Sequence, residues 1–248
     1  MIISRKVWPV LRGLSLVRSD PALLPRLSLP AAYHPRTIHS STAMAAGFKQ
    51  NRGTGDKGKS SLFNNERRWK DDEVFQSVGT IDELVCSSHA KEARHAELAD
   101  VVQVLTRVQC CLQDVGAHVA TPPESSDRKK KLTSFDIAMV EWINAEIDRF
   151  GDQLPPIRQF ILSGGGVTSS SLQHARAVAR RAERTMIPLV RDEQIDPQAL
   201  KFVNRLSDLL FVLGRYSCMR CGEEELTYLR PREFVEQKWN RKRLDTSK

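Results

Sequence analysis

The sequence lacks several features that would assign it to a class of protein at once. No stretch approaches the roughly 20 consecutive apolar residues that a membrane-spanning helix needs. No segment alternates apolar and polar residues as a half-buried strand does, and no internal repeat is present. The five cysteines form no even set of disulfide pairs. These absences argue against a membrane protein, a disulfide-stabilised secreted domain and a repeat protein.

Side chains suited to acid–base or metal chemistry are also scarce. Four histidines lie in the body of the chain without the spacing of a metal site: His89, His95, His118 and His174. Cys218 and Cys221 form a single CxxC pair with no second pair or histidine nearby, which we interpret as helix packing rather than zinc or redox chemistry. The sequence therefore predicts neither a persuasive nucleophile with its base nor a metal held by protein side chains.

The excess of basic charge lies at the two ends of the chain. Residues 1–47 hold six arginines and lysines against one acidic residue, and residues 230–248 hold seven against three. The ends thus carry +9 against a formal net charge of +8, and residues 48–229 are close to −1. The pI of 9.4 therefore gives no support to a nucleic-acid-binding body.

The composition of residues 1–47 is typical of a mitochondrial transit peptide. The segment is rich in arginine and poor in acids, contains scattered serine and leucine, and lacks the dense apolar core of a secretory signal. A disordered tail is the alternative. With a transit peptide, we expect the protein in the mitochondrial matrix, where its cysteines stay reduced.

Helical hydrophobic periods fill the rest of the chain. Apolar residues recur at spacings of three and four, and the last helix begins with Asp196 as its cap and Pro197 at its first position. The polar, glycine-rich residues 48–69 and the lysine-containing residues 121–131 are expected as loops. The five expected helices cover residues 71–94, 95–120, 134–150, 168–190 and 197–220. The predicted fold is all-α: one antiparallel five-helix bundle with ferritin-like up-down packing over residues 48–222, followed by a basic flexible tail, 223–248.

The connection between the third and fourth helices, residues 151–168, exceeds the roughly 2–8 residues usual in bundles. It contains the apolar run Phe160-Ile-Leu, followed by Ser163 and three glycines. A binding loop would account for both features, and a slack linker is the alternative.

The fourth helix carries four arginines and one glutamate within nine residues: Arg176, Arg180, Arg181, Glu183 and Arg184. Like charges four residues apart on a helix cost roughly 0.2–0.5 kcal/mol per pair. A solvated basic face would tolerate that cost, and so would an anion-binding helix, since the guanidinium fork suits phosphate oxygens.

Two acidic elements are available to these arginines. One is Asp82-Glu83 on the first helix, and the other is Asn204 with Asp208, which share a face of the last helix. Because buried carboxylates are seldom left unpaired, we expect an Arg–Asp contact made by Arg180 or Arg176.

Residues 53–60 fit the P-loop pattern G-x-x-x-x-G-K-S letter for letter. We reject a P-loop, because polar residues precede the pattern where a buried strand should stand, and no helix continues from it. A glycine-rich loop with Lys57, Lys59, Ser60 and Ser61 can still bind phosphate through exposed backbone N–H groups.

Six separated motifs stand in the order found in ATP:cob(I)alamin adenosyltransferases. The chain resembles a mitochondrial, vertebrate-type member of that family over roughly residues 50–222. The resemblance implies a five-helix bundle assembled as a homotrimer, with active sites between subunits. The motifs are Thr54-Gly-Asp-Lys-Gly58, Lys70-Asp-Asp72, Val78-Gly-Thr-Ile-Asp-Glu-Leu84, Phe160-Ile-Leu162 with its glycines, Arg176-Ala-Val-Ala-Arg-Arg-Ala-Glu-Arg184 and Asn204-Arg-Leu-Ser-Asp208.

The resemblance also implies roles for individual residues. Phe160 would crowd the lower face of the corrin and favour loss of its axial base, Asp82 and Arg180 would form an intersubunit ion pair, and Arg180, Asp208 and Phe160 would act in catalysis. The cobalamin-binding residues would be Phe160, Asp82, Arg176 and Asp208. The ATP-binding residues would be Arg52, Gly53, Thr54, Gly55, Asp56, Lys57, Ser60, Ser61, Lys70, Arg180, Arg181, Glu183, Arg184 and Asn204.

The reaction implied by the resemblance needs few catalytic side chains. The cobalt of cob(I)alamin is itself the nucleophile, attacks C5′ of ATP and expels triphosphate, so the protein positions the substrates and stabilises anionic charge, with Mg²⁺ accompanying ATP. The implied partners are methylmalonyl-CoA mutase, as client for the product, and a cob(II)alamin reductase system. Neither nucleic acid nor a membrane is expected.

The sequence departs from the family pattern at four places. Gly53 stands where the family usually has arginine, unless a slip of one residue lets Arg52 serve. Ser163-Gly164 replaces a proline-containing pair, which would loosen the loop. Gln173 replaces a histidine, with His174 displaced by one, and Lys59 is unusual. We expect these changes to affect rate and affinity more than identity.

Two other classes of function stay open at this point. One is a cobalamin-binding or chaperone-like bundle that has lost turnover through its altered loops. The other is a basic helical nucleic-acid binder, which only the overall charge supports.

Overall fold

The computed structural model of the chain describes residues 53–88, 96–230 and 241–244. The expected transit peptide and Arg52 lie outside these residues. Two small antiparallel sheets are present: β1 (Lys59–Ser61) pairs with β2 (Arg67–Trp69), and β3 (Glu224–Leu226) pairs with β4 (Arg241–Arg243). The helices are α1 (Glu73–Ser88), η3 (Ala96–Leu98), α2 (Ala99–Val119), α3 (Asp127–Leu132), α4 (Ala138–Gly151), α5 (Gly166–Arg191) and α6 (Pro197–Arg220).

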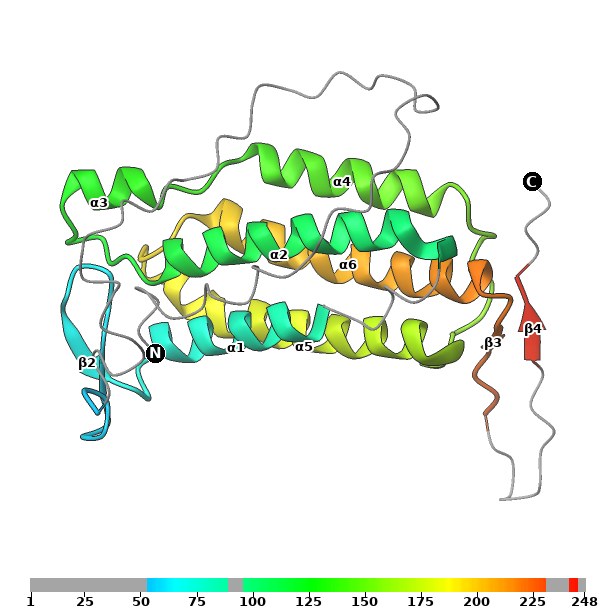
Figure 1. Ribbon diagram of the computed structural model, residues 1–248, viewed down its shortest axis with the longest axis horizontal. Coiled ribbons are helices and arrows are strands. Elements are labelled where there is room, and N and C mark those ends of the chain that lie inside the picture. The colour runs from blue at the N-terminus through cyan, green and yellow to red at the C-terminus, as the bar shows by residue number, and fades with distance from the viewer. Residues whose placement is uncertain (1–52, 89–95, 231–240, 245–248) are drawn as a thin grey trace.

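The five long helices α1, α2, α4, α5 and α6 run side by side, and the two sheets lie at opposite ends of the bundle (Figure 1). α5 packs against both α1 and α6, and α4 packs against α6. The stripe that α5 buries consists mainly of small residues, with Ala175, Ala179 and Ala182 fully enclosed and Met186 beyond them. Such a stripe lets neighbouring helices approach closely. The all-α bundle expected from the hydrophobic periods is confirmed.

Two segments expected as loops contain regular structure. Within residues 48–69, β1 and β2 form a hairpin whose turn places Asn65 in the left-handed region, with φ of 71°. Strands of three residues are too short for an alternating pattern to be visible in the sequence. Within residues 121–131 the lysine run forms α3, and Lys129 donates a 2.9 Å hydrogen bond to the carbonyl of Phe63. The bond joins α3 to the hairpin.

The chain after α6 also differs from expectation. The bounds predicted for α6 itself, 197–220, are those observed. The next residues were expected to begin a flexible tail, but they form β3, whose central residue Glu225 is buried. The buried contacts of this strand come from distant parts of the chain, which local patterns do not reveal. None of the described helices combines the length and apolar character needed to cross a membrane.

The start of α6 is fixed by a cap and by a histidine. Asp196 accepts a 2.8 Å hydrogen bond from the N–H of Gln198, as the predicted cap should. The N–H of Asp196 donates to Nε2 of His118 at 2.9 Å, and Nδ1 of His118 lies 3.0 Å from the carbonyl oxygen of Thr133. His118 therefore joins α2, the end of α3 and the start of α6.

Candidate active site

The arginine cluster lies on the face of α5 that turns away from the buried alanine stripe. Arg180, Arg181 and Arg184 are exposed, and Arg176 is half-buried. Arg184 donates to the carbonyl oxygen of Arg180 at 3.1 Å, within its own helix. Arg176 donates from Nε to Oε1 of Gln173 at 2.9 Å and lies over the ring of Phe211, 5.9 Å from its centroid. Among the described residues, the Arg180 side chain has no acidic partner and Arg184 uses one of its donors within its own helix, so both guanidiniums can bind an anion.

The acidic partner of the cluster is not the one predicted. An Arg–Asp contact was expected for Arg180 or Arg176, but neither arginine contacts an aspartate among the described residues; Arg181 instead forms an ion pair with Glu83 of α1. The side chains of adjacent helical residues point about 100° apart, so Arg181 can face α1 while its neighbour Arg180 does not. Asp82 is half-buried, and burial raises the pKa of its carboxyl group. Its intersubunit pair with Arg180 stays a prediction.

A polar network links α5 to α6. Asn204 donates from Nδ2 to Oε1 of Glu183 at 2.8 Å. Arg205 donates to Oδ1 of Asn204 at 2.9 Å and lies 3.6 Å from Oδ2 of Asp208. The predicted common face of Asn204 and Asp208 is therefore confirmed, with Arg205 between them. The network fixes the orientation of the Asn204 amide beside the arginine cluster.

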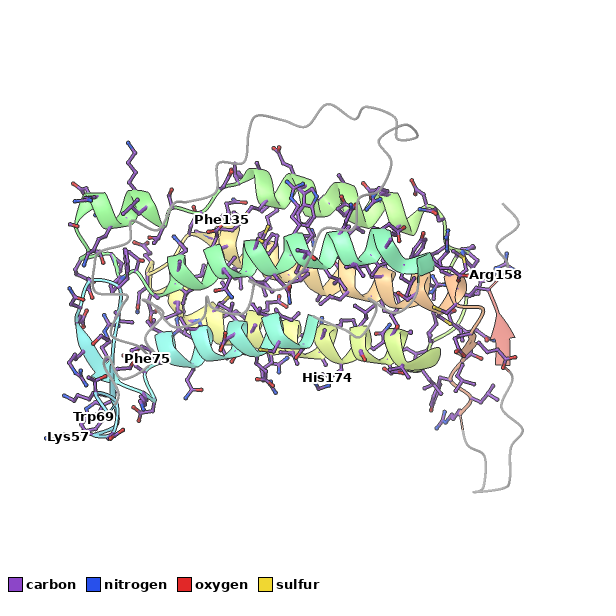
Figure 2. The ribbon with its side chains drawn as sticks, in the orientation of Figure 1. Lys57, Trp69, Phe75, Phe135, Arg158 and His174 are labelled. Carbon is purple, nitrogen blue, oxygen red and sulfur yellow. The ribbon has the colours of Figure 1, made fainter. Side chains whose placement is uncertain are left out.

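The glycine-rich loop and the hairpin lie at one end of the bundle, where Figure 2 labels Lys57 and Trp69. Arg67 of β2 holds the loop by donating to the carbonyl of Thr54 at 2.7 Å and to that of Lys59 at 3.2 Å. A strand, not a helix, follows the glycines, so the rejection of a P-loop is confirmed. What the loop offers a phosphate is backbone N–H groups and lysines.

Several candidate ATP-binding residues gather in this loop. The ammonium of Lys70 lies so close to Gly55 that a methyl group on that glycine would be 3.1 Å from Nζ. Asp56 and Lys57 are exposed at the tip, whereas Ser60 is buried and Ser61 half-buried in β1. Gly53 has φ of 85°, a conformation that glycine adopts readily and arginine does not.

The unusual Lys59 has a partner in the hairpin. It stands opposite Trp69 in the register of β1 and β2, and its Nζ lies 4.8 Å from the centroid of the Trp69 ring. A cation–π contact of this kind contributes about 0.5–1 kcal/mol at an exposed site. Lys59 therefore has a structural partner within the hairpin besides any role with phosphate.

Phe160 lies at the other end of the bundle, in the connection that leads into α5. Its side chain is 74% exposed, and its ring meets that of Tyr228 edge-to-face at a centroid distance of 6.2 Å. The connection pairs with the chain after α6, because Leu162 donates to the carbonyl of Leu226 at 2.8 Å. The slack-linker alternative is wrong, since this connection is bonded to a second segment.

A buried ion pair anchors both segments, and sequence reasoning missed it. Arg215 of α6 donates from Nε to Glu225 at 2.8 Å and from Nη2 to the carbonyl of Pro155 at 3.1 Å. The Arg215 and Glu225 side chains are 6% and 10% exposed. An arginine inside the apolar run of α6 was a usable signal, because a buried guanidinium requires partners.

The glycines before α5 allow close packing against the end of α6. At Gly165, where φ is 81°, a methyl group would lie 2.6 Å from Sγ of Cys218. Burial raises the pKa of the Cys218 thiol to about 12, so the thiol stays protonated at neutral pH. Cys218 and Cys221 are free thiols, and the interpretation of the CxxC pair as helix packing is confirmed for Cys218.

Gln173, at the position of the usual histidine, is buried between α5 and α6. Its Nε2 lies so close to Gly214 that a methyl group there would be 2.8 Å away. Its Oε1 orients Arg176, as described above. Among residues 53–88, 96–230 and 241–244, no three His, Cys, Asp or Glu side chains gather as a metal site.

The candidate residues thus form three groups along α5. The 26 residues of this helix correspond to about 39 Å. Phe160 lies before its start, and Arg180, Arg181 and Arg184 occupy its second half. A 2.8 Å hydrogen bond from Ser77 to the carbonyl of Thr185 brings the hairpin end of α1 alongside that half. A charged, donor-rich surface therefore lies on α5, and an exposed aromatic residue lies in the connection before it.

Comparison with known proteins gives one consistent result. The chain matches the family model described as cobalamin adenosyltransferase over residues 51–217. It is 46% identical over 177 residues to corrinoid adenosyltransferase MMAB of Bos taurus, with 71% of this chain and 73% of the bovine protein covered. Its identity to the Homo sapiens protein of the same name is 45% over 179 residues, with 71% and 72% covered.

A solved structure agrees with these matches. A variant of the PduO-type ATP:corrinoid adenosyltransferase from Lactobacillus reuteri, complexed with cobalamin and ATP, has a TM-score of 0.67 and 30% sequence identity, with 73% of this chain and 96% of that chain covered. The matched region takes in the hairpin, the Phe160 connection and the arginine cluster. The chain belongs to the cobalamin adenosyltransferase family.

Proposed function

We propose that this protein transfers the 5′-deoxyadenosyl group of ATP to the cobalt of cob(I)alamin, giving adenosylcobalamin and triphosphate. The family match over residues 51–217 carries the proposal, because it spans all three groups of candidate residues. The relatives are named corrinoid adenosyltransferases, and one related structure holds cobalamin and ATP.

The reaction explains why acid–base side chains are scarce. The electron pair of cob(I)alamin forms the bond between cobalt and C5′, while the C5′–O bond breaks and triphosphate leaves with the electron pair of that C5′–O bond. No proton has to move in this step. The chain's contribution is to bind the triphosphate through the hairpin N–H groups, Lys70, Arg180 and Arg184, in a geometry set by the Glu183–Asn204 bond.

Mg²⁺ enters this scheme as the companion of ATP. The described residues form no three-ligand metal site of their own, and Mg²⁺ is commonly held by substrate phosphates with one or two carboxylates. When bound, the ion supplies positive charge to the triphosphate. Asp56 and Glu183 are the two carboxylates among the candidate ATP-binding residues.

We propose further that the protein acts as a homotrimer with Asp82 and Arg180 paired between subunits. The support is that Asp82 is half-buried without a cation in the described part of its own chain, while Arg180 is exposed. A guanidinium from another subunit would stabilise the carboxylate form that burial disfavours. The molar mass in solution by light scattering tests this: a monomer at micromolar concentration would contradict it.

The cellular setting is part of the proposal. The arginine-rich residues 1–47 support import into the mitochondrial matrix. There, a cob(II)alamin reductase system would supply the reduced substrate, and methylmalonyl-CoA mutase would receive the product from this enzyme.

The adenosylation assay tests the central proposal. The purified chain is mixed with ATP, Mg²⁺ and chemically reduced cobalamin, and loss of the cob(I)alamin absorbance is followed. We expect ATP-dependent formation of adenosylcobalamin. Folded protein that binds corrinoid without forming product would contradict the proposal and favour a cobalamin-binding bundle without turnover.

A further inference from the structure

Phe160 is exposed on a connection without helix or strand of its own, so its orientation depends on contacts from elsewhere. Its ring and that of Tyr228 meet at an interplanar angle of 81°, the edge-to-face arrangement that aromatic pairs favour. The Tyr228 side chain is itself 49% exposed. The pair therefore stands on the surface, with the Tyr228 ring bracing one side of the Phe160 ring.

The backbone places these two rings in register. The N–H of Tyr228 donates to the carbonyl of Phe160 at 2.7 Å, and Ile161 forms an antiparallel bridge with Thr227. Residues opposite each other in an antiparallel pair project side chains to the same face. The contact between the rings is therefore a consequence of strand pairing.

The paired segments are held to the bundle by one guanidinium. Arg215 contacts Glu225 on the C-terminal segment and the carbonyl of Pro155 on the Phe160 connection. Both contacts come from a single side chain of α6, so the spacing of the two segments is fixed by the helix. Tyr228 is thereby positioned by the bundle and can restrict the motion of the Phe160 ring.

We infer that Tyr228 is a positioning residue that holds Phe160 against the lower face of the corrin, which makes the segment after β3 part of the cobalamin site. The inference rests on the proposed function and on the role that the family resemblance implies for Phe160. A Phe160 ring without its brace would sample more orientations and would crowd the axial base less. The effect should therefore appear with corrinoids that carry a lower base and not with those that lack one.

The test uses the full chain with Tyr228→Leu, Tyr228→Phe, Phe160→Ala and the double variant Phe160→Ala/Tyr228→Leu. The base-off fraction of bound cob(II)alamin is measured by electron paramagnetic resonance in the presence of ATP. We expect Tyr228→Leu to lower the ratio of base-off to base-on form about threefold to tenfold, and Tyr228→Phe, which keeps the ring, to retain it. In the double variant the ratio should equal that of Phe160→Ala alone.

Turnover gives the second readout. With cob(II)alamin reduced in the assay, Tyr228→Leu should lose activity, whereas with cobinamide, which has no lower base, it should stay within about twofold of wild type, and the KM for ATP should not change. Leu132→Ala, an exposed apolar residue on α3, is the control and should match wild type.

Three results would overturn the inference: an unaltered base-off ratio in Tyr228→Leu, an equal loss with cobinamide, or full additivity with Phe160→Ala. A wild-type chain without adenosyltransferase activity would instead contradict the proposed function. The two failures are thus distinguishable, because the first set is measured against an active wild type.

Discussion

The two ends of the bundle differ in how their candidate binding groups are held. At the hairpin end Lys57 and Lys70 are exposed, and the glycine loop is held by its own backbone hydrogen bonds and by those from Arg67 to backbone carbonyls. At the other end Phe160 is braced by a strand pairing, an aromatic contact and a buried ion pair. The surface proposed for the large, rigid corrin is therefore preorganised. The side chains proposed for the flexible, charged nucleotide would become ordered when it binds.

The charged part of α5, Arg180–Arg184, lies between the two ends of the bundle. A substitution there should have the largest effect on activity. Glu183→Lys removes the acceptor of the Asn204 bond and adds a cation beside Arg180 and Arg184. We expect turnover to fall by at least about 100-fold, because a hydrogen bond to a charged group contributes about 1.5–3 kcal/mol and the added charge repels its neighbours. The adenosylation assay measures the loss, and circular dichroism checks that helical content is kept.

The matched control for this variant is Glu141→Lys, which makes the same charge change on an exposed position of α4. It should retain nearly full activity. Normal turnover in Glu183→Lys would show that the site lies elsewhere and would remove the arginine cluster from the proposal.

The contrast between a buried and an exposed ion pair should appear in stability. Glu225→Gln leaves the Arg215 guanidinium buried without its counter-charge, and we expect the free energy of unfolding to fall by about 3–5 kcal/mol. Glu83→Gln breaks the exposed pair with Arg181 and should cost less than about 1 kcal/mol. Urea denaturation measures both values. Equal losses would show that the Phe160 end is no more firmly held than the helix surface.

The glycine run offers a smaller effect than the buried ion pair, with a control one residue away. Gly165→Ala forces a positive φ on alanine and drives its methyl group onto Cys218, so we expect a loss of about 1–3 kcal/mol. Gly164→Ala meets nothing within 4 Å and has no positive φ, so it should change stability little. Thermal unfolding of the two variants separates them, and a similar midpoint for both would mean that the end of α6 yields to the added methyl.

Much of the fold could be predicted because it depends on local patterns. Apolar residues at spacings of three and four predicted helices with buried faces, and Ala175, Ala179 and Ala182 form such a face in α5. Asp196 with Pro197 predicted the start of α6. The pairing of Arg181 with Glu83 was not predicted; the sequence offered the neighbouring residue Arg180 instead. A hydrophobic period identifies the buried face of a helix, but it does not decide between two neighbouring residues whose side chains point about 100° apart.

The rest of the site depends on contacts that no local pattern contains. Arg215 and the carbonyl that it binds at Pro155 are separated by 60 residues, and the strand pairing of the Phe160 connection involves residues more than 60 positions away. The hairpin was missed for a different reason, because its strands have three residues each. Predictions of chemistry needed the family resemblance, since spacing alone left the arginines as either a solvated face or an anion site.

The unbroken course of α5 has a consequence for how this chain can vary in length. From Gly166 to Glu183 no residue interrupts the helix. Deleting one residue there would shift everything beyond it by about 1.5 Å and rotate it by about 100°. The alanine stripe would then leave the core on one side of the deletion, and Glu183 would turn away from Asn204. Within this part of the helix the number of residues is therefore as constrained as their identity.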